Sequence, residues 1–382
     1  MKKIKLIIEK IINNLTLEYT EDLNGNIKGR VALFYIVHPL LIPKSHRNKV
    51  RFSNDGIAQN IPRVLNELGY IVDIIHFKNK GWALKHDYDF IICHGGDLPP
   101  LLYPQLPSRT KKIFFSTGRY WKDANLSAAK RLLEFTSNTG YLLQPERNII
   151  TDEEYGVINS DAIICLGNEE LAKDYRKYNK NTYCINNGVF PFNSTQKPKL
   201  KNSKNVLFLA GRGNIHKGLD LLIDVFSNNP DFTLHVCQHI DNDFNNVINN
   251  KLQGSKNIII HDFVKMRSPE FDAIANSCSY SILPTCSEGQ PGSVLECMQY
   301  GLVPIISKEA NIDFDTFVVK IDTLDSQGVE QSLYRIKELS DEKYSHLSSL
   351  AIQSCAEKYS EQAFRESFRK VINTITGNGV ID

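Results

Sequence analysis

Two glutamates flank a glycine-containing turn in the C-terminal half of the chain. In the stretch SEGQPGSVLE, Glu288 and Glu296 stand eight positions apart, with Gly289 and Gly292 between them. The pattern is helical from about Ser293, so the turn lies at a helix N-terminus, where free amides attract anions and glycines let a ligand approach. Carboxylates beside amide donors suit a ligand with hydroxyls and phosphate, such as a sugar nucleotide. A surface helix with acidic residues favoured by the helix dipole would also explain the pattern.

A second loop that could bind phosphate lies about seventy residues earlier in the chain. The stretch FLAGRGNIHKGLDLL has the pattern of a strand, a loop and a helix, and its loop contains Arg212 and Lys217. It is not a dinucleotide-binding fingerprint, because His216 stands where the third glycine is required, and it lacks the Gly-Lys-Ser/Thr of a P-loop. Two cations beside a helix start suit a diphosphate, whose negative charge they would stabilise as it leaves.

Apolar runs that alternate with helical patterns predict the elements that position these loops. Continuous apolar runs are typical of strands that are buried on both faces of a parallel sheet. Because the alternation occurs twice, the sequence predicts an α/β protein with two doubly wound Rossmann-like domains that face each other across a cleft. The predicted strands are 31–37, 71–77, 89–97, 112–118, 160–168 and 181–189 in the first domain, and 205–210, 232–239, 257–264, 280–286, 302–307 and 317–322 in the second.

A polar stretch with two prolines marks the boundary between the predicted domains. Residues 191–204 have no apolar period and are predicted to be a linker. They separate an N-terminal domain, residues 1–190, from a second domain, residues 205–355. Residues 1–30 are predicted to be an N-terminal helix and a polar connection. Residues 356–382 are predicted to be a C-terminal helix, and its return to the N-terminal domain is left open.

In the first domain, side chains that could contact an acceptor follow two predicted strands. His94 and Gly95 come at the end of one strand, and Thr117 and Gly118 at the end of another. The carboxyl ends of strands in an open α/β sheet border the ligand-binding crevice, so these residues are candidate acceptor contacts. Both a ligand or base role and a structural role are left open for His94. The basic loop 45–51 could meet acceptor or phosphate, or could simply be solvated.

The first fifteen residues predict a basic amphipathic helix. Its apolar stripe is surrounded by lysines, so the helix could make peripheral contact with an anionic membrane. Packing against its own domain would explain the same pattern. The stripe consists of Ile4, Ile7, Ile8, Ile11, Ile12 and Leu15, and the lysines are Lys2, Lys3, Lys5 and Lys10.

Composition excludes several other classes of protein. The 382 residues are 42% hydrophobic and 23% charged, as in ordinary globular proteins, and a net charge of +2 gives no case for nucleic-acid binding. Apolar runs are too short to span a bilayer, and no signal-peptide pattern is present. Eight scattered cysteines lack metal-ligand spacing and are expected as reduced thiols, which indicates a cytoplasmic location, with the inner face of the membrane left open. An Asp-x-Asp pattern occurs three times, too often to indicate a metal site.

The two loops together resemble the donor half of the retaining GT-B glycosyltransferases of family GT4, or glycosyltransferase group 1. FLAGRGNIHKGLDLL is followed by SEGQPGSVLECMQYGLVPIIS with its Glu-x7-Glu, in the family's order. SDAIICLGN and INNGV resemble the family's strand before the linker and its linker entry, so the likeness covers about residues 160–310. The N-terminal half matches only in its strand pattern, as expected for an acceptor-binding domain.

This resemblance implies a role for each residue of the donor site. Arg212 and Lys217 would hold the donor diphosphate and Glu288 the transferred sugar, which makes these three the candidate catalytic residues, while Glu296 would hold the ribose hydroxyls. The family needs no metal, and its donor is a substrate, here a UDP- or GDP-linked sugar. The other implied donor contacts are Gly289, Gln290, Pro291, Gly292 and Ser293 in the turn, Phe263 and Val264 beside the base, and Gly56 in place of the family's first glycine-rich loop.

The chain departs from the family at one further position. A histidine often follows the strand equivalent to KIFFSTG, where this chain has Thr117 and Gly118, so that His94 is the nearest substitute. The predicted function is retaining transfer of a hexose-like sugar to a glycan or lipid-linked acceptor in surface-polysaccharide assembly. Alternatives are a sugar-nucleotide-binding protein without catalysis, and an NAD-dependent oxidoreductase. The latter is disfavoured because the strand 232–239 does not end in an acidic residue that could hold a ribose.

Overall fold

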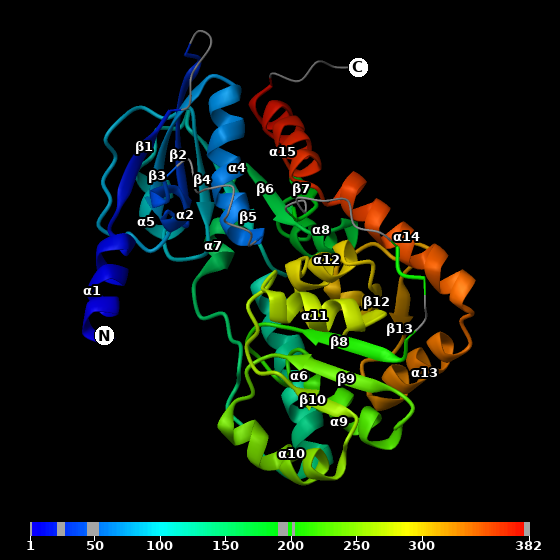
Figure 1. Cartoon of the computed structure of the whole chain (residues 1–382). Helices are drawn as coiled ribbons and strands as arrows, with labels where there is room; N and C mark the ends of the chain where they lie inside the picture. The colour runs from blue at the N-terminus through cyan, green and yellow to red at the C-terminus, as the bar shows by residue number, and fades with distance from the viewer. Residues whose placement is uncertain (1, 21–26, 44–52, 190–197, 201–202, 378–382) are drawn as a thin grey trace. The chain divides into compact units, whose positions relative to one another are not determined.

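The chain forms two compact units in the computed structural model, which describes residues 2–20, 27–43, 53–189, 198–200 and 203–377. The first unit contains Met1–Trp121, Ile150–Phe190 and Tyr359–Asp382, and the second contains Lys122–Ile149 and Pro191–Lys358. Each unit has one predominantly parallel sheet with helices packed against it (Figure 1). The prediction of two Rossmann-like α/β domains is therefore confirmed.

The first unit contains a seven-stranded sheet in the order β1-β3-β2-β4-β5-β6-β7. All neighbouring strands are parallel except β1 and β3. Successive residues of β2 enter opposite layers of the core, because Val31 and Leu33 pack in one cluster and Ala32 and Phe34 pack in another with Trp82. The strands are β1 (Thr16–Tyr19), β2 (Gly29–Tyr35), β3 (Tyr70–His76), β4 (Phe90–His94), β5 (Lys111–Ser116), β6 (Ala162–Leu166) and β7 (Thr182–Ile185).

The C-terminal helix α15 (Glu361–Thr376) packs on this first sheet and on helix α4 (Ser53–Glu67). Phe364 and Phe368 of α15 lie in the core cluster of the unit, and burying two such side chains contributes about 3 kcal/mol or more. Arg365 and Arg369 both pair with Glu67 at the end of α4. The remaining helices of the unit are α1 (Lys2–Asn13), α2 (His38–Leu41), α5 (Pro99–Leu102), η1 (Tyr103–Gln105), α7 (Glu153–Ile158) and α8 (Glu169–Arg176).

Two segments of the first unit differ from the sequence prediction. Residues 1–30 are predicted as a helix and a polar connection, but strand β1 lies within them and pairs antiparallel with β3. A strand of four residues is too short for an alternating pattern to stand out. Gly56 is predicted to lie in a loop, but it lies in the first turn of α4, which begins at Ser53. The basic loop 45–51 lies outside the described residues.

The second unit contains a six-stranded parallel sheet in the order β10-β9-β8-β11-β12-β13. Its central strands are apolar and almost wholly buried, as parallel strands covered on both faces should be. The predicted strand 257–264 is shorter than expected, since only Ile258–Ile260 pair with β9. The strands are β8 (Asn205–Leu209), β9 (Thr233–Cys237), β10 (Ile258–Ile260), β11 (Tyr280–Leu283), β12 (Val303–Ser307) and β13 (Val319–Ile321). The helices are α9 (Leu219–Asn228), α10 (Asn242–Gly254), α11 (Pro269–Ser277), α12 (Gly292–Gln299), η2 (Lys308–Ala310), α13 (Ser326–Lys337) and α14 (Asp341–Lys358).

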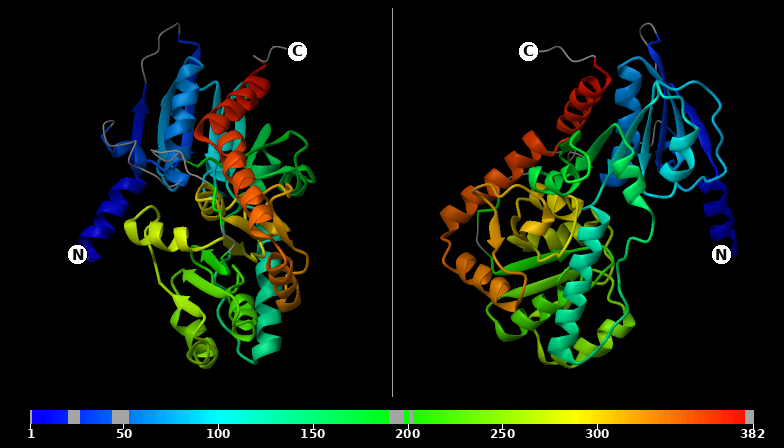
Figure 2. Two further views of the ribbon diagram at one scale, coloured as in Figure 1. Left: turned by 45° about the vertical axis from the view of Figure 1, so that its right-hand side comes forward. Right: turned by 180° about the vertical axis from the view of Figure 1, so that it is seen from behind.

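Helix α6 (Trp121–Thr139) and the extended segment after it belong to the second unit from Lys122 to Ile149 (Figure 2). Arg131 of α6 forms a buried ion pair with Asp220 of α9 at 2.6 Å. Phe135 packs against Phe244 of α10, with ring centroids 5.9 Å apart. The sequence pattern placed residues 122–149 in the N-terminal domain, whereas their contacts attach them to the second sheet. Most of the predicted linker 191–204 lies outside the described residues.

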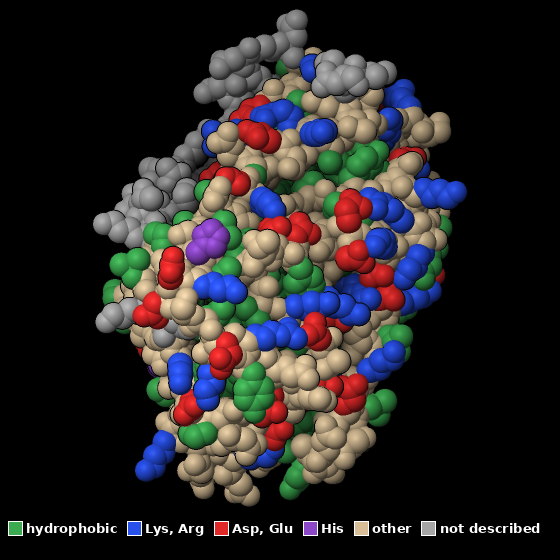
Figure 3. All heavy atoms as spheres, turned by 90° about the vertical axis from the view of Figure 1, so that its right-hand side faces the viewer, with side chains coloured by type: hydrophobic (Ala, Val, Ile, Leu, Met, Phe, Trp, Pro, Cys, Tyr) green, Lys and Arg blue, Asp and Glu red, His purple; other side chains and the backbone are tan. Residues whose placement is uncertain are grey.

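The surface is of mixed charge. Figure 3 shows Lys and Arg side chains interspersed with Asp and Glu over the face in view, in keeping with a net charge of +2. All eight cysteines are free thiols, and all but Cys184 are buried. Among the described residues, no helix is long and apolar enough to cross a membrane.

Candidate functional site

The candidate site lies at the carboxyl ends of β8 and β11, which are neighbours in the second sheet. The loop 210–218 follows β8 and the loop 284–291 follows β11. Because both loops leave the same edge of a parallel sheet, the two motifs that the sequence indicates lie side by side. Gly218 has a φ of 77°, and a Cβ there would lie 2.3 Å from the carbonyl oxygen of Pro284. Glycine thus lets the two loops approach closely.

Buried amide side chains hold the loop after β8 in one conformation. The Asn214 side chain is fully buried, and its Nδ2 donates to Gln238 Oε1 at 3.0 Å and to the carbonyl of His239 at 3.1 Å. Gln238 donates in turn to the carbonyl of Gly211. The loop is therefore tied to the end of β9, which fixes the position of Lys217 at its far end.

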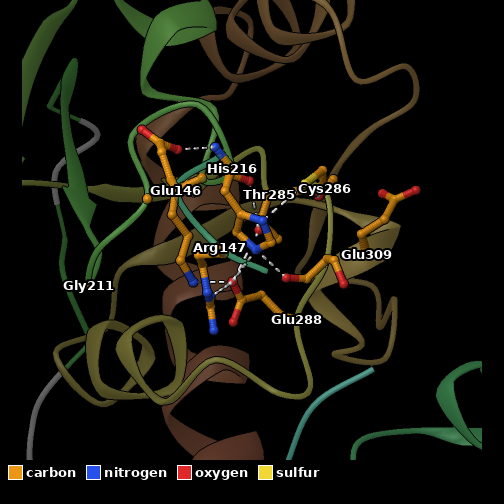
Figure 4. Close-up of polar contacts among 12 residues, drawn as sticks. Glu146, Arg147, Gly211, His216, Thr285, Cys286, Glu288 and Glu309 are labelled. Atoms are coloured by element: carbon orange, nitrogen blue, oxygen red, sulfur yellow. Dashed lines mark hydrogen bonds and ion pairs between the residues drawn. The ribbon is translucent and has the colours of Figure 1, made fainter. Parts of the chain in front are cut away.

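Glu288 is the centre of the polar contacts between the two loops (Figure 4). The Lys217 ammonium pairs with Glu288 Oε1, and Thr285 Oγ1 and Arg147 Nη1 each donate to the same oxygen at 3.3 Å. The Nε2 of His216 lies 3.4 Å from it. All these contacts reach Oε1, so Oε2 has no polar partner among the described residues.

The surroundings of Glu288 keep its carboxylate ionised. Burial by itself raises the pKa of this carboxyl, but Lys217, His216 and Arg147 together hold the pKa of Glu288 well below its usual range. Burial lowers the pKa of the Lys217 ammonium, and the charge of Glu288 opposes that effect. The Lys217 and Glu288 side chains are only 9% and 12% exposed, so solvent screens their attraction less than in a surface pair.

A carboxylate from a distant part of the sequence caps the backbone amides of the loop after β8. Glu146 Oε1 accepts from the N–H of Asn214 at 2.8 Å, and its Oε2 accepts from those of Ile215 and His216 at 2.9 and 3.1 Å. Burial raises the pKa of Glu146, while the three amides favour its charged form. The sequence predicts a diphosphate beside this helix start, and the structure shows that the three amides already have an acceptor.

The glycine-containing turn has a closed part and an accessible part. Residues 289–291 are buried, and Gln290 Nε2 donates to the carbonyl of Asn311 at 3.1 Å. Residues 292 and 293 begin helix α12 and are half-buried. The helix start is therefore within one residue of the predicted position, and its first two residues are partly accessible.

Glu296 belongs to an ion pair that does not include Glu288. Arg267 Nε and Nη2 donate to Glu296 Oε1 and Oε2, the latter at 2.9 Å, and both side chains are almost fully buried. Arg267 Nη2 also donates to Gln299 Oε1 at 2.7 Å. The backbone of Arg267 has a φ of 57°, a left-handed conformation that is uncommon for residues other than glycine. The predicted ribose contact is thus engaged by a guanidinium in this structure.

The other predicted donor contacts differ in accessibility. Arg212 is exposed and has no polar partner among the described residues, so it is available to a phosphate. Phe263 is 79% exposed, whereas Val264 is buried in the core of the unit. Of this predicted pair, only Phe263 offers its side chain to a base.

The acceptor-side candidates of the first unit lie at the carboxyl ends of β4 and β5, which are parallel neighbours. His94 Nδ1 lies 3.0 Å from the carbonyl of Phe115, and burial lowers the pKa of His94. Its neighbour Gly95 has a φ of 76°. Thr117 and Gly118 follow β5, and a Cβ at Gly118 would meet no atom within 4 Å. Sequence reasoning missed a titratable group in the same unit: burial raises the pKa of the Glu153 carboxyl, at the start of α7, to about 7.

Comparison with known proteins connects this geometry with glycosyl transfer. Residues 192–313 match the family model described as glycosyl transferases group 1. That segment contains the loop of Lys217 and the turn after Glu288, together with the strands that position them. Comparison with curated protein sequences gives no match.

Solved structures with low sequence identity share the architecture. Sucrose-phosphate synthase from Thermosynechococcus elongatus matches with a TM-score of 0.65 at 12% identity, over 92% of this chain and 100% of that one. TarM from S. aureus, in a complex that includes UDP, matches with a TM-score of 0.52 at 15% identity. The match covers 74% of this chain and 55% of the TarM chain. HepE from Anabaena, in complex with UDP and glucose, matches with a TM-score of 0.55 at 10% identity. The match covers 90% of this chain and 99% of the HepE chain. The chain has the GT-B fold. It spans about half the length of the TarM chain that it matches.

Three residues that contact the candidate site or its neighbouring elements escaped the sequence prediction. Glu146 and Arg147 lie in a polar run without periodicity, and the only signal was their charge in a segment bounded by Pro145 and an apolar pair. Arg267 follows the short strand β10, in a stretch predicted only to line the base. Their roles depend on contacts with residues 29 to 141 positions away in sequence, which local patterns do not encode.

Proposed function

We propose that this chain is a glycosyltransferase that moves a sugar from a nucleoside diphosphate to an acceptor hydroxyl with retention of anomeric configuration. The observation that carries the proposal is the ionised, half-satisfied carboxylate of Glu288, whose Oε1 is held by Lys217 while Oε2 has no polar partner among the described residues. A fixed hydroxyl acceptor beside a buried cation suits a sugar joined to a diphosphate. The match of residues 192–313 to the glycosyl transferases group 1 model supports this assignment.

This reaction requires stabilisation of the charge that develops on the diphosphate and positioning of the transferred sugar. The bond between the anomeric carbon and the diphosphate oxygen breaks, and the acceptor oxygen bonds to the same carbon from the same face. The leaving diphosphate oxygen takes the acceptor proton, so no separate base is required. Lys217 and Arg212 stabilise the charge that develops on the diphosphate, while Glu288 holds a sugar hydroxyl. This assignment makes the donor a substrate and gives no role to a metal ion.

Glu288→Ala and Arg212→Ala are each expected to lower transfer at least a hundredfold, because each removes a contact made at the reacting sugar or diphosphate. Thermal-shift screening with UDP-, GDP- and ADP-sugars identifies the donor, since a bound ligand raises the melting temperature according to its affinity. Transfer is then measured as release of the nucleoside diphosphate, and the anomeric configuration of the product by NMR. Wild-type rates in both variants would reject the assignment. Tight donor binding with neither transfer nor slow hydrolysis would favour a binding protein instead.

We also propose a glycan or lipid-linked acceptor, as in surface-polysaccharide synthesis at the cytoplasmic face of a membrane. The support is helix α1, whose apolar side chains Ile4, Ile7, Ile8 and Ile11 are between 51% and 63% exposed. Lys5 and Lys10 lie on the same helix. A helix with exposed isoleucines and lysines can lie in the interface of an anionic membrane.

The double change Ile7→Asp and Ile11→Asp is expected to weaken binding to vesicles of phosphatidylglycerol and phosphatidylcholine at least tenfold. Each substitution removes an apolar side chain that the membrane interface would bury, and each new carboxylate repels the anionic surface. Co-sedimentation with vesicles measures the effect, and deletion of residues 1–15 should match it. Leu126→Asp, which alters an exposed apolar residue outside α1, is the control and should bind like wild type. Equal sedimentation of wild type and the double variant would show that α1 has no membrane role.

A further inference from the structure

Arg147 is a cation at the site that neither the sequence pattern nor the proposed mechanism uses. Its Nη1 lies 3.3 Å from Glu288 Oε1, the oxygen that also pairs with Lys217. The rest of its guanidinium has no polar partner among the described residues, and the side chain is 47% exposed. Arginine presents five N–H donors in a planar fork that matches the oxygens of a phosphate. Most of this fork is available to a ligand.

The segment that carries Arg147 is anchored on both sides of it. On one side Glu146 binds three backbone amides of the loop after β8. On the other side the backbone of Ile149 exchanges two hydrogen bonds of 2.9 Å with the side chain of Asn125 in α6. The large apolar residues Tyr141 and Leu142 of this segment are exposed, so polar anchors, more than a core, determine where it lies.

These anchors determine which groups remain for a diphosphate. Because Glu146 occupies the amides of residues 214–216, this end of the site depends on side-chain cations for its positive charge. Lys217 is one of them, but it is already paired with Glu288. The Arg212 side chain is exposed and has no polar partner among the described residues. Arg147 lies in a segment whose backbone is anchored on both sides, and its Nη1 contacts Glu288 Oε1 (Figure 4). This is the oxygen that also pairs with Lys217.

We propose that Arg147 is a third cation of the donor site that contacts the donor diphosphate, and that Glu146 positions it. This inference rests on the proposed function and adds two residues to the site. When a sugar hydroxyl engages Glu288, the guanidinium turns its free N–H groups to the diphosphate. Glu146 acts through Arg147 and does not itself touch the donor.

Calorimetric titration of the full chain with UDP, GDP and ADP tests the proposal, and NMR titration with uridine, guanosine and adenosine supplies the phosphate-free reference. Arg147→Ala is expected to weaken diphosphate binding at least tenfold and to leave nucleoside binding unchanged. Arg147→Lys should recover part of the loss because it keeps the charge. Glu146→Ala should reproduce the selective loss for diphosphates. Gln144→Ala, on the same segment, is the control and should bind like wild type.

The outcomes separate this inference from the proposed function. If wild type binds a nucleoside diphosphate and Arg147→Ala binds it equally well, Arg147 has no donor role and the proposed function stands. Tighter diphosphate binding by Glu146→Ala would overturn the inference, because Glu146 would then be a competitor of the diphosphate. An equal loss of nucleoside and diphosphate affinity in Glu146→Ala would reduce Glu146 to a purely structural role and also overturn it. If wild type binds none of the diphosphates, the proposed function and this inference both fail.

Discussion

Replacing Lys217 by methionine is expected to slow transfer strongly and to lower the free energy of unfolding by about 3 kcal/mol. The variant leaves the Glu288 carboxylate buried with only part of its positive surroundings, and it removes a cation from the leaving diphosphate. A loss of about a hundredfold to a thousandfold in kcat is expected for one such electrostatic contact. Urea unfolding and the transfer assay measure the two effects separately.

The pH dependence of this variant tests the ion pair itself. Because the pKa of Glu288 is held below its usual range in the folded protein, the stabilisation is fully present above the ordinary glutamate pKa and is lost as the pH falls through the lower, folded value. The stability difference between wild type and Lys217→Met should therefore be largest near neutral pH and should shrink in acid. Lys173→Met breaks an exposed pair with Glu170 and should cost less than about 1 kcal/mol at any pH. A difference for Lys217→Met that stays constant from neutral pH to well below the ordinary glutamate pKa would contradict the role given to Glu288.

Arg267→Met is expected to lower the free energy of unfolding by about 3–5 kcal/mol, since it removes the guanidinium that pairs with the buried Glu296 carboxylate. The two side chains are 4% and 5% exposed, and both carboxylate oxygens accept from the guanidinium. Replacing both residues, as Arg267→Met with Glu296→Leu, should restore much of the stability because no buried charge then remains. Urea unfolding of the single and double variants measures this coupling.

The same double variant tests the predicted ribose contact of Glu296. If Glu296 binds a ribose when donor is present, the stable double variant should bind the donor nucleotide at least tenfold more weakly than wild type. Unchanged affinity would leave Glu296 with the structural role seen in the ion pair with Arg267. If the double variant were as unstable as Arg267→Met, loss of the counter-charge of the buried Glu296 carboxylate would not be the cause.

The sheets and the central pair of the site could be predicted from the sequence for a physical reason. A parallel strand that is covered on both faces must be apolar along its length, so runs such as 31–37 and 205–210 stand out. The loops after two such strands meet at one edge of the sheet, which brings Lys217 and Glu288 together. Spacing and residue type were enough here because the parallel sheet places the loops after neighbouring strands at the same edge.

The attachment of α6 could not be predicted in this way. Its sequence is helical, but a helical pattern does not state which sheet its buried face covers, and the decisive contacts join Arg131 to Asp220 and Phe135 to Phe244. Because Glu146 and Arg147 follow α6, their place at the site was hidden for the same reason. Gly56 shows a different failure, since a glycine suggested a loop although the helix begins at Ser53.

The assignment of residues 122–149 to the second unit means that the chain passes between the units at four places along the sequence. Cleavage at the predicted linker 191–204 would therefore not release two autonomous halves. A fragment that starts at residue 191 lacks the arginine that neutralises buried Asp220 and the carboxylate that caps the amides of residues 214–216. Each unit of this GT-B fold is built from stretches on both sides of the predicted linker. The two fragments should therefore fold by complementing each other and not independently.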